Sequence, residues 1–235
     1  MNKYRVLSGS LLKTIALVAM IIDHIAVGFS ATVSFRILSI GSHTLTLYRL
    51  MRIIGRISFP IYSFLLVEGF IHTTDRKKYG IRLLLFALIS EIPWNLVHNN
   101  SLFYNKQNVF FTLLIGYLGL CNIEILENAE YRDNKSICNL LLLLLISFII
   151  NADYGCTGFA FILFLYISNN NKLLQAVIGS CILPSKWQAG LAFIPISLYN
   201  NKRGYIKNKT QALLFYLIYP LHLLIIWIIK AKIIG

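Results

Sequence analysis

The sequence predicts an all-α, polytopic membrane protein: a bundle of about nine transmembrane helices, within a range of eight to ten. Of its 235 residues, 57% are apolar and only 13% are charged, and the mean hydropathy is +0.68. A soluble domain of this length needs far more polar surface. The apolar residues fall into blocks, and little chain remains between them. We therefore expect one integral-membrane domain over residues 1–235.

Polar breaks between the apolar blocks set the expected bounds of the spans. The first span runs near 13–32, and the charges before it resemble a secretory signal. However, Asp23 and His24 interrupt its apolar core and no small-x-small cleavage site follows, so we interpret it as an uncleaved helix. The other spans run near 54–72, 80–97, 109–125, 136–151, 155–168, 172–183, 187–199 and 211–230. The seventh and eighth are short enough to be tilted, re-entrant or merged.

The basic residues predict the orientation of the chain. With a cytoplasmic N-terminus, the inner segments hold fourteen of the 22 Lys and Arg residues. Such an excess follows the positive-inside rule. The many Asn, Ile and Lys residues are typical of an AT-rich bacterial genome, so we expect a multi-pass protein of the bacterial inner membrane. These inner segments are 1–13, 73–82, 124–135, 169–172 and 200–210. The same rule explains the net charge of +13 without nucleic acid, because the basic residues form no separate module. The four cysteines lack CxxC spacing, so no metal is expected.

Many polar side chains interrupt the predicted spans, although a charge at the bilayer centre costs about 2.5–3.5 kcal/mol on insertion scales. On the alternating topology, most of them lie between the midplane and the outer face. Arg52 and Arg56 approach that level from outside, whereas Glu68, His72 and Arg82 lie at the inner end. The sequence therefore predicts an outward-biased polar cavity and a separate inner cluster. The outer set is Asp23, His24, Glu91, Asn95, Asn108, Thr112, Asp153 and His222.

Helical spacing leaves two interpretations open for the main candidates. Arg49, Arg52 and Arg56 form a stripe at i, i+3 and i+7, which either snorkels toward lipid phosphates or binds an anionic ligand. Neighbouring residues on a helix point about 100° apart. One member of the Asp23–His24 pair can then face a ligand while the other pairs sideways with an arginine. The alternative is a satisfied buried polar pair without a ligand.

Six motifs, in order along nearly the whole chain, are similar to the TraX family of membrane proteins. The longest is LMRIIGRISFPIYSFLLVEGFIHTTDRKKYGIRLLLFALISEIPWNL, from Leu50 to Leu96. The others are MIIDHI, NVFFTLLIG, NADYGCTG, YNNKRG and FYLIYPLHLL. The resemblance implies a multi-helical membrane acyltransferase related to the broad acyltransferase-3 group. Family members are associated with acetylating the N-terminus of pilin from acetyl-CoA.

In that wider group a histidine early in the first span is the catalytic residue, and His24 occupies its place. His24 is then either the general base of a direct transfer or a transient acyl carrier. Asp23 or Glu91 would orient it. The resemblance and the chemistry of CoA imply a further set of residues that bind the substrates. Amides or arginines in this set would stabilise an oxyanion. Cations in it would hold the phosphates of CoA. This set is Arg52, Arg56, Asn95, Asn108, Asp153, Tyr154, His222, Arg82, Lys202 and Arg203.

Acetyl-CoA is cytosolic, whereas the predicted cavity lies between the midplane and the outer face of the membrane. We therefore expect the nucleotide at the inner basic loops and the acceptor from the outer side. The acceptor is a peptide N-terminus, an amino sugar or another small molecule, and the remaining partner is membrane lipid. The competing class is a transporter or lipid flippase that uses Asp23, His24 and Glu91 as a proton relay. A non-enzymatic scaffold is a third class, and it leaves the polar side chains unexplained.

Overall fold

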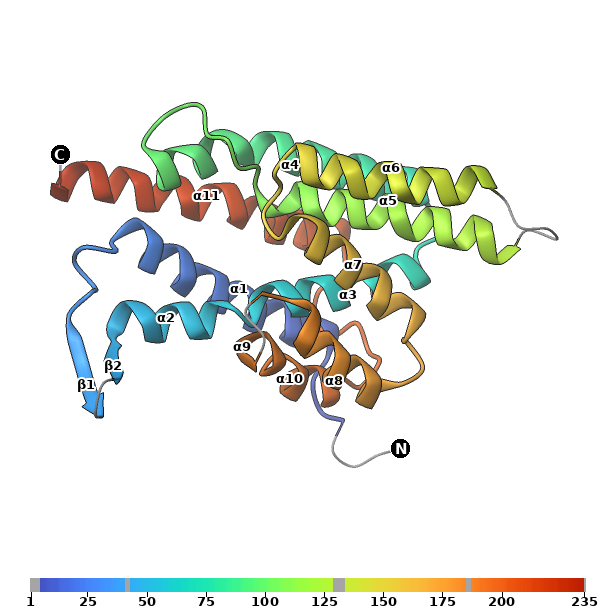
Figure 1. The fold of residues 1–235 in the computed structure, drawn as a ribbon, viewed down its shortest axis with the longest axis horizontal. Coiled ribbons are helices and arrows are strands. Elements are labelled where there is room, and N and C mark those ends of the chain that lie inside the picture. Colours follow the sequence, from blue (N-terminus) through green and yellow to red (C-terminus); the bar gives the residue numbers. More distant parts are fainter. Residues whose placement is uncertain (1–4, 41–42, 129–133, 185–186, 235) are drawn as a thin grey trace. The chain divides into compact units, whose positions relative to one another are not determined.

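The computed structural model describes residues 5–40, 43–128, 134–184 and 187–234 and is mostly helical (Figure 1). It divides into two compact units. The first contains Met1–Tyr62, Ile92–Tyr104 and Trp187–Gly235, and the second contains Ser63–Glu91 and Asn105–Lys186. Helices α3 (Ser58–His72) and α4 (Arg76–Asn99) each contribute to both units.

The first unit is built around α1 (Gly9–Gly28), which packs against α2 (Leu47–Gly55) and α11 (Lys209–Ile234). It also holds the hairpin of β1 (Arg36–Ile40) and β2 (His43–Thr46) and the short helices α9 (Trp187–Gly190) and α10 (Phe193–Ser197). Pro93 and Pro220 lie inside α4 and α11, which continue past them, as membrane helices tolerate.

Two glycines bring α1 close to its neighbours. A Cβ atom on Gly28 would lie 2.5 Å from Cγ2 of Ile226 in α11. A Cβ atom on Gly55 in α2 would lie 2.1 Å from Oδ1 of Asp23. Small residues at helix interfaces allow backbones to approach, which is how membrane helices gain packing contacts. Both glycines therefore fix the surroundings of the Asp23–His24 pair.

A loop over residues 199–207 closes the N-terminal end of α1. The backbone N–H groups of Gly9 and Ser10 donate to the carbonyls of Lys202 and Arg203 at 2.8 and 2.9 Å. Oγ of Ser10 also donates to the Arg203 carbonyl at 2.6 Å and accepts from the N–H of Ile206 at 2.9 Å. These bonds satisfy donors that the first turn of a helix leaves unpaired. They also leave the side chains of Lys202 and Arg203 exposed.

The second unit consists of the rest of α3 and α4 with α5 (Val109–Asn128), α6 (Asn134–Ile149), α7 (Gly155–Ile167) and α8 (Lys172–Ile182). Its central contact joins α5 and α7. A Cβ atom on Gly116 would lie 2.4 Å from Cδ1 of Ile162, and one on Gly119 would lie 2.8 Å from Phe159. The same small-residue packing therefore recurs here.

The long apolar helices confirm a multi-pass helical membrane protein. Among the described residues, five helices are long and apolar enough to cross a membrane: Gly9–Gly28, Leu47–His72, Arg76–Asn99, Val109–Asn128 and Thr210–Ile233. The prediction of nine spans goes beyond these five helices. Within the described residues, Asn134–Ile149, Gly155–Ile167 and Lys172–Ile182 are helical but shorter. The block expected at 187–199 breaks into α9 and α10, of four and five residues.

The all-α prediction missed the hairpin. Leu38 of β1 pairs with Leu45 of β2, and Arg36 pairs with Thr46 across an irregularity in register. The two segments, RILSI and HTLT, are rich in Ile and Thr, whose branched side chains suit a strand. Both segments lie between the expected spans 13–32 and 54–72, where no strand is predicted.

We predict that Gly28→Ala lowers the thermal unfolding midpoint in detergent, because the added methyl group overpacks the α1–α11 contact. Overpacking typically costs about 1–3 kcal/mol. Gly9→Ala in the same helix is the matched control, since its Cβ would meet neighbours no closer than 3.6 Å. Differential scanning fluorimetry compares the two variants. Equal midpoints would contradict the close α1–α11 packing.

Candidate functional site

His24 and His222 form a buried pair of imidazoles between α1 and α11. Nδ1 of His24 lies 2.7 Å from Nε2 of His222, within hydrogen-bonding distance. The ring centroids are 5.0 Å apart and the ring planes differ by 29°. The residues are 6% and 7% exposed. Nδ1 of His222 in turn donates to the carbonyl oxygen of Ile218 at 2.8 Å.

Three further rings surround His24. Trp94, His98 and Tyr219 stand edge-on to its imidazole, with centroid distances of 5.9, 6.0 and 5.9 Å. Trp94 and His98 stack on each other at 3.6 Å, and Nδ1 of His98 donates to the Trp94 carbonyl at 3.0 Å. Among the described residues, no three His, Cys, Asp or Glu side chains gather closely enough to hold a metal ion. The arrangement is an aromatic enclosure around the His24 imidazole.

Asp23 points away from His24 and toward α2. Its Oδ2 lies 2.5 Å from Nη1 of Arg52, and the two side chains are 18% and 23% exposed. Its Oδ1 is buried and has no hydrogen-bond partner among the described residues. Arg56, also half-buried, caps the C-terminal end of α2. Consecutive residues on α1 thus serve two different helices, as the 100° step of a helix requires.

Within the first unit, the side chain at hydrogen-bonding distance from Nδ1 of His24 is the imidazole of His222. Of the two carboxylates expected to orient His24, Asp23 is engaged by Arg52, and Glu91 is described within the second unit. There the Glu91 carboxylate accepts from Nδ2 and the backbone N–H of Asn108, at 2.6 and 3.3 Å. His222, expected only as a binding residue, is the group that contacts Nδ1 of His24.

The remaining outer candidates of the second unit surround the start of α7. Oγ1 of Thr112 donates to the carbonyl of Asp153, whose N–H donates to the carbonyl of Gln107 at 2.9 Å. Tyr154 has a positive φ of 66°, a conformation that a non-glycine residue seldom adopts. These residues, like the Glu91–Asn108 pair, belong to the second unit.

The other candidates are dispersed. In the first unit, Asn95 is 4% exposed and its Nδ2 donates to the carbonyl of Leu102 at 2.9 Å, while its Oδ1 is buried without a partner among the described residues. Lys202 and Arg203 lie at the opposite end of α1 from His24. In the second unit, the guanidinium of Arg82 lies 5.3 Å from the ring centroid of Tyr79.

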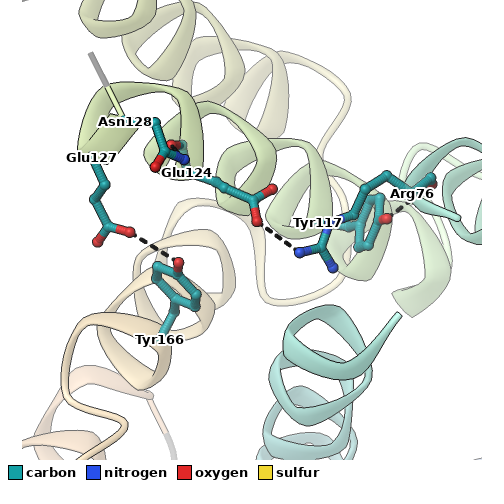
Figure 2. A network of polar contacts seen from close by, with 6 residues as sticks. All are labelled: Arg76, Tyr117, Glu124, Glu127, Asn128 and Tyr166. Atoms are coloured by element: carbon teal, nitrogen blue, oxygen red, sulfur yellow. Dashed lines mark hydrogen bonds and ion pairs between the residues drawn. The ribbon is translucent and has the colours of Figure 1, made fainter. Parts of the chain in front are cut away.

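Figure 2 shows a polar network that joins α4, α5 and α7 within the second unit. Nη2 of Arg76 donates to Oε1 of Glu124 at 2.7 Å, and the guanidinium lies 3.7 Å from the ring centroid of Phe70. The hydroxyl of Tyr117 donates to the Arg76 carbonyl at 2.9 Å. The hydroxyl of Tyr166 donates to Glu127 at 3.0 Å. These contacts hold α4, α5 and α7 together, and they engage the Arg76 guanidinium with Glu124.

Sequence reasoning missed Trp94 and His98 as members of the site. They follow Glu91 at i+3 and i+7, so helical spacing places them along one side of α4. The candidates that the sequence predicts on this helix are Arg82, Glu91 and Asn95. A histidine near the end of a predicted span, one turn after a tryptophan, was the available signal.

We predict that Arg52→Met destabilises the protein strongly, because it leaves the Asp23 carboxylate buried without its partner. Breaking a buried pair costs up to about 3–5 kcal/mol, and Asp23→Asn/Arg52→Met should recover much of the loss. Lys78→Met is the control, because its pair with Asp75 is exposed. Unfolding in mixed micelles measures the three variants. Full stability of Arg52→Met would rule out a structural role for the ion pair.

The comparisons with known proteins agree with the motifs. A family model described as TraX protein matches residues 8–230. A probable fimbrial assembly protein FimC, serogroup H1, of Dichelobacter nodosus is 35% identical over 117 residues, which cover 46% of this chain and 43% of that protein. An uncharacterized protein of Rickettsia prowazekii (strain Madrid E) is 29% identical over 167 residues, covering 69% and 56%.

The chain spans about half the length of these curated relatives, at 43% and 56%. No solved structure matches it. The family model, in contrast, covers nearly the whole chain. The chain is therefore a membrane protein of the TraX family.

Proposed function

We propose that this protein is a membrane-embedded acyltransferase. It moves an acetyl group from cytosolic acetyl-CoA to an amine or hydroxyl of an acceptor that enters from the outer side. The observation that carries the proposal is the buried His24 imidazole, hydrogen-bonded to His222 inside a membrane-spanning helix of a TraX family protein. His24 is the general base or the transient acyl carrier.

The surroundings of His24 suit acyl transfer from a thioester. An imidazole takes and returns protons near neutral pH, as the acceptor and the leaving thiolate require. The rings of Trp94, His98 and Tyr219 limit the access of water to it, which protects the thioester from hydrolysis. Asn95 offers a buried amide for an oxyanion or for the acceptor. Asp23 acts indirectly, because its ion pair with Arg52 fixes α2 beside α1.

The loop at the start of α1 is the proposed site for the CoA phosphates. Lys202 and Arg203 are exposed there, and neither forms an ion pair within the described part of the chain. In the other basic segment, Arg76 is paired with Glu124 and Lys78 with Asp75. His24 lies fifteen residues along α1 from Gly9, or about 22 Å at the rise of an α-helix. The pantetheine arm would cover that distance from the end predicted to be cytoplasmic.

The acceptor is proposed to reach His24 from the outer side. The association of the TraX family with pilin acetylation, and a fimbrial assembly relative, favour a peptide N-terminus. An amino sugar or another small molecule is the alternative acceptor. Arg52, Arg56, Asn108, Asp153, Tyr154 and Arg82 remain proposed contacts of the substrates. We propose that the whole chain acts as one domain in a bacterial inner membrane, in contact with lipid.

A transporter or lipid flippase is the second candidate function. Its support is the burial of ionisable groups, since His24 and His222 are buried and the half-buried Glu91 also lies in an apolar helix. The two functions differ in their products. Only the acyltransferase releases free CoA with acceptor-dependent kinetics, whereas a proton-coupled transporter moves its substrate along a pH gradient without CoA.

We predict that His24→Gln lowers acetyl transfer by about 10²–10⁴-fold, the range that general acid–base catalysis contributes. The measurement is release of free thiol from acetyl-CoA by purified protein in nanodiscs, with a panel of amine and sugar acceptors. His72→Gln is the matched control, because its side chain is 71% exposed and pairs with Glu68. A wild-type protein that neither binds nor cleaves acetyl-CoA would favour the transporter.

We predict that Lys202→Glu/Arg203→Glu raises the KM for acetyl-CoA by at least about tenfold, since a hydrogen bond to a charged group contributes about 1.5–3 kcal/mol. The kcat should change little, because neither residue is near His24. Lys232→Glu is the control, an exposed cation in the last turn of α11. Steady-state kinetics separates the two parameters. An unchanged KM in the double variant would move the nucleotide site elsewhere.

A further inference from the structure

We propose that His222 is a positioning residue that fixes the tautomer of His24. It holds the proton of the neutral His24 imidazole on Nδ1 and so makes Nε2 the reacting nitrogen. The catalytic consequence rests on the proposed acyl transfer, whereas the tautomer itself does not.

The positions of the imidazole protons follow from the carbonyl of Ile218. A carbonyl oxygen only accepts hydrogen bonds, so the 2.8 Å contact requires a proton on Nδ1 of His222. A neutral imidazole carries one N–H, and Nε2 of His222 therefore presents a lone pair. This lone pair faces Nδ1 of His24 at 2.7 Å, so Nδ1 of His24 must be the donor. The second nitrogen of His24, Nε2, is then unprotonated and basic.

The geometry of the two rings supports a directed hydrogen bond. The lone pair of an imidazole nitrogen lies in the plane of its ring, and the ring planes differ by only 29°. Gly28 against Ile226 sets the separation of α1 and α11 one turn beyond His24. The edges of Trp94 and Tyr219 limit rotation of the His24 ring. The backbone of α11 thus decides, through His222, which nitrogen of His24 reacts.

A neutral partner also suits a membrane. A carboxylate in this position would bring a charge into an apolar helix pair, which is costly unless it is compensated. Asp23, the nearest carboxylate along α1, is instead paired with Arg52. Two neutral imidazoles reproduce the orienting part of a catalytic triad without a permanent charge.

The proposed transfer balances through Nε2 alone. The acceptor R–NH₂ loses a proton to Nε2 of His24 as its nitrogen bonds to the carbonyl carbon of acetyl-CoA. The C–S bond then breaks, and the CoA thiolate takes the proton from Nε2 to leave as CoA–SH. While His24 is an imidazolium, its Nδ1–H donates a charge-assisted bond to the lone pair of His222. His222 stays neutral throughout.

Nitrogen-15 NMR of histidine-labelled protein in nanodiscs tests the tautomer without any turnover. The chain has five histidines, so single His→Gln variants assign the signals. We expect a protonated Nδ1 and an unprotonated Nε2 for His24 in the wild type. His222→Gln should keep this tautomer, because an amide oxygen can accept from Nδ1. His222→Phe should lose it, because the phenyl ring offers no lone pair.

The rate of acetyl transfer should change with the tautomer, so that His222→Gln stays close to the wild type and His222→Phe falls below it. Loss of a group that orients a catalytic or ligating histidine costs about 10–100-fold. We expect that fall in kcat for His222→Phe, little change in KM, and recovery of most of the kcat in His222→Gln. A purely structural role of His222 would not restore the kcat and the Nδ1–H signal together.

The outcomes separate this inference from the proposed function. The expected tautomer in a protein that transfers no acetyl group supports the role of His222 and contradicts the acyltransferase. Acetyl transfer by a wild-type protein whose His24 carries its proton on Nε2 overturns the role of His222 alone. An unchanged His24 signal in folded His222→Phe overturns it as well. If that variant does not fold, the wild-type and His222→Gln spectra decide.

Discussion

The hydrogen bond between His24 and His222 is the interaction on which the site depends. It joins α1 to α11 across 198 residues of sequence, at a depth where both imidazoles are almost fully buried. Gly28 makes the contact possible by letting α11 approach α1. A polar bond in this position is strongly specified, since separating the helices would leave two unpaired imidazoles in an apolar environment.

The opposite side of α1 carries the ion pair between Asp23 and Arg52. Asp23 and Arg52 bring a charged pair into the protein, and Gly55 lets α2 come close enough for it to form. The pair fixes α2 and keeps the carboxylate away from His24. Structural and chemical tasks are thus divided between two consecutive residues by the geometry of the helix. The first unit also holds the basic loop at the other end of α1, so one helix connects both proposed ends of the reaction path.

Much of the fold could be predicted from the sequence, because hydropathy is a local property. The expected spans at 80–97, 109–125 and 211–230 lie within α4, α5 and α11, and the family follows from the motifs. The β1–β2 hairpin was missed because two short strands resemble a polar break. The pairing of His24 with His222 was also missed. Sequence spacing ranks neighbours on one helix, whereas this pair depends on which helices pack together.

The candidate site, like the fold, could be predicted from the sequence only in part. His24 and the polar residues around it could be named from the cost of burying them and from the resemblance. Their grouping could not, and Glu91 with Asn108 proved to belong to a cluster of the second unit. Trp94 and His98 went unnoticed because an aromatic residue in a membrane helix usually only packs against lipid or neighbouring helices.

The most direct test of the central claim is acetyl transfer across a sealed membrane. Proteoliposomes would receive isotopically labelled acetyl-CoA on one side and hold a short peptide with a free N-terminus, or an amino sugar, on the other. Mass spectrometry then measures the labelled acceptor. Acylation by the wild type and its loss in His24→Gln is the predicted result. No labelled acceptor with the wild type, or equal labelling by both proteins, would contradict the role given to His24.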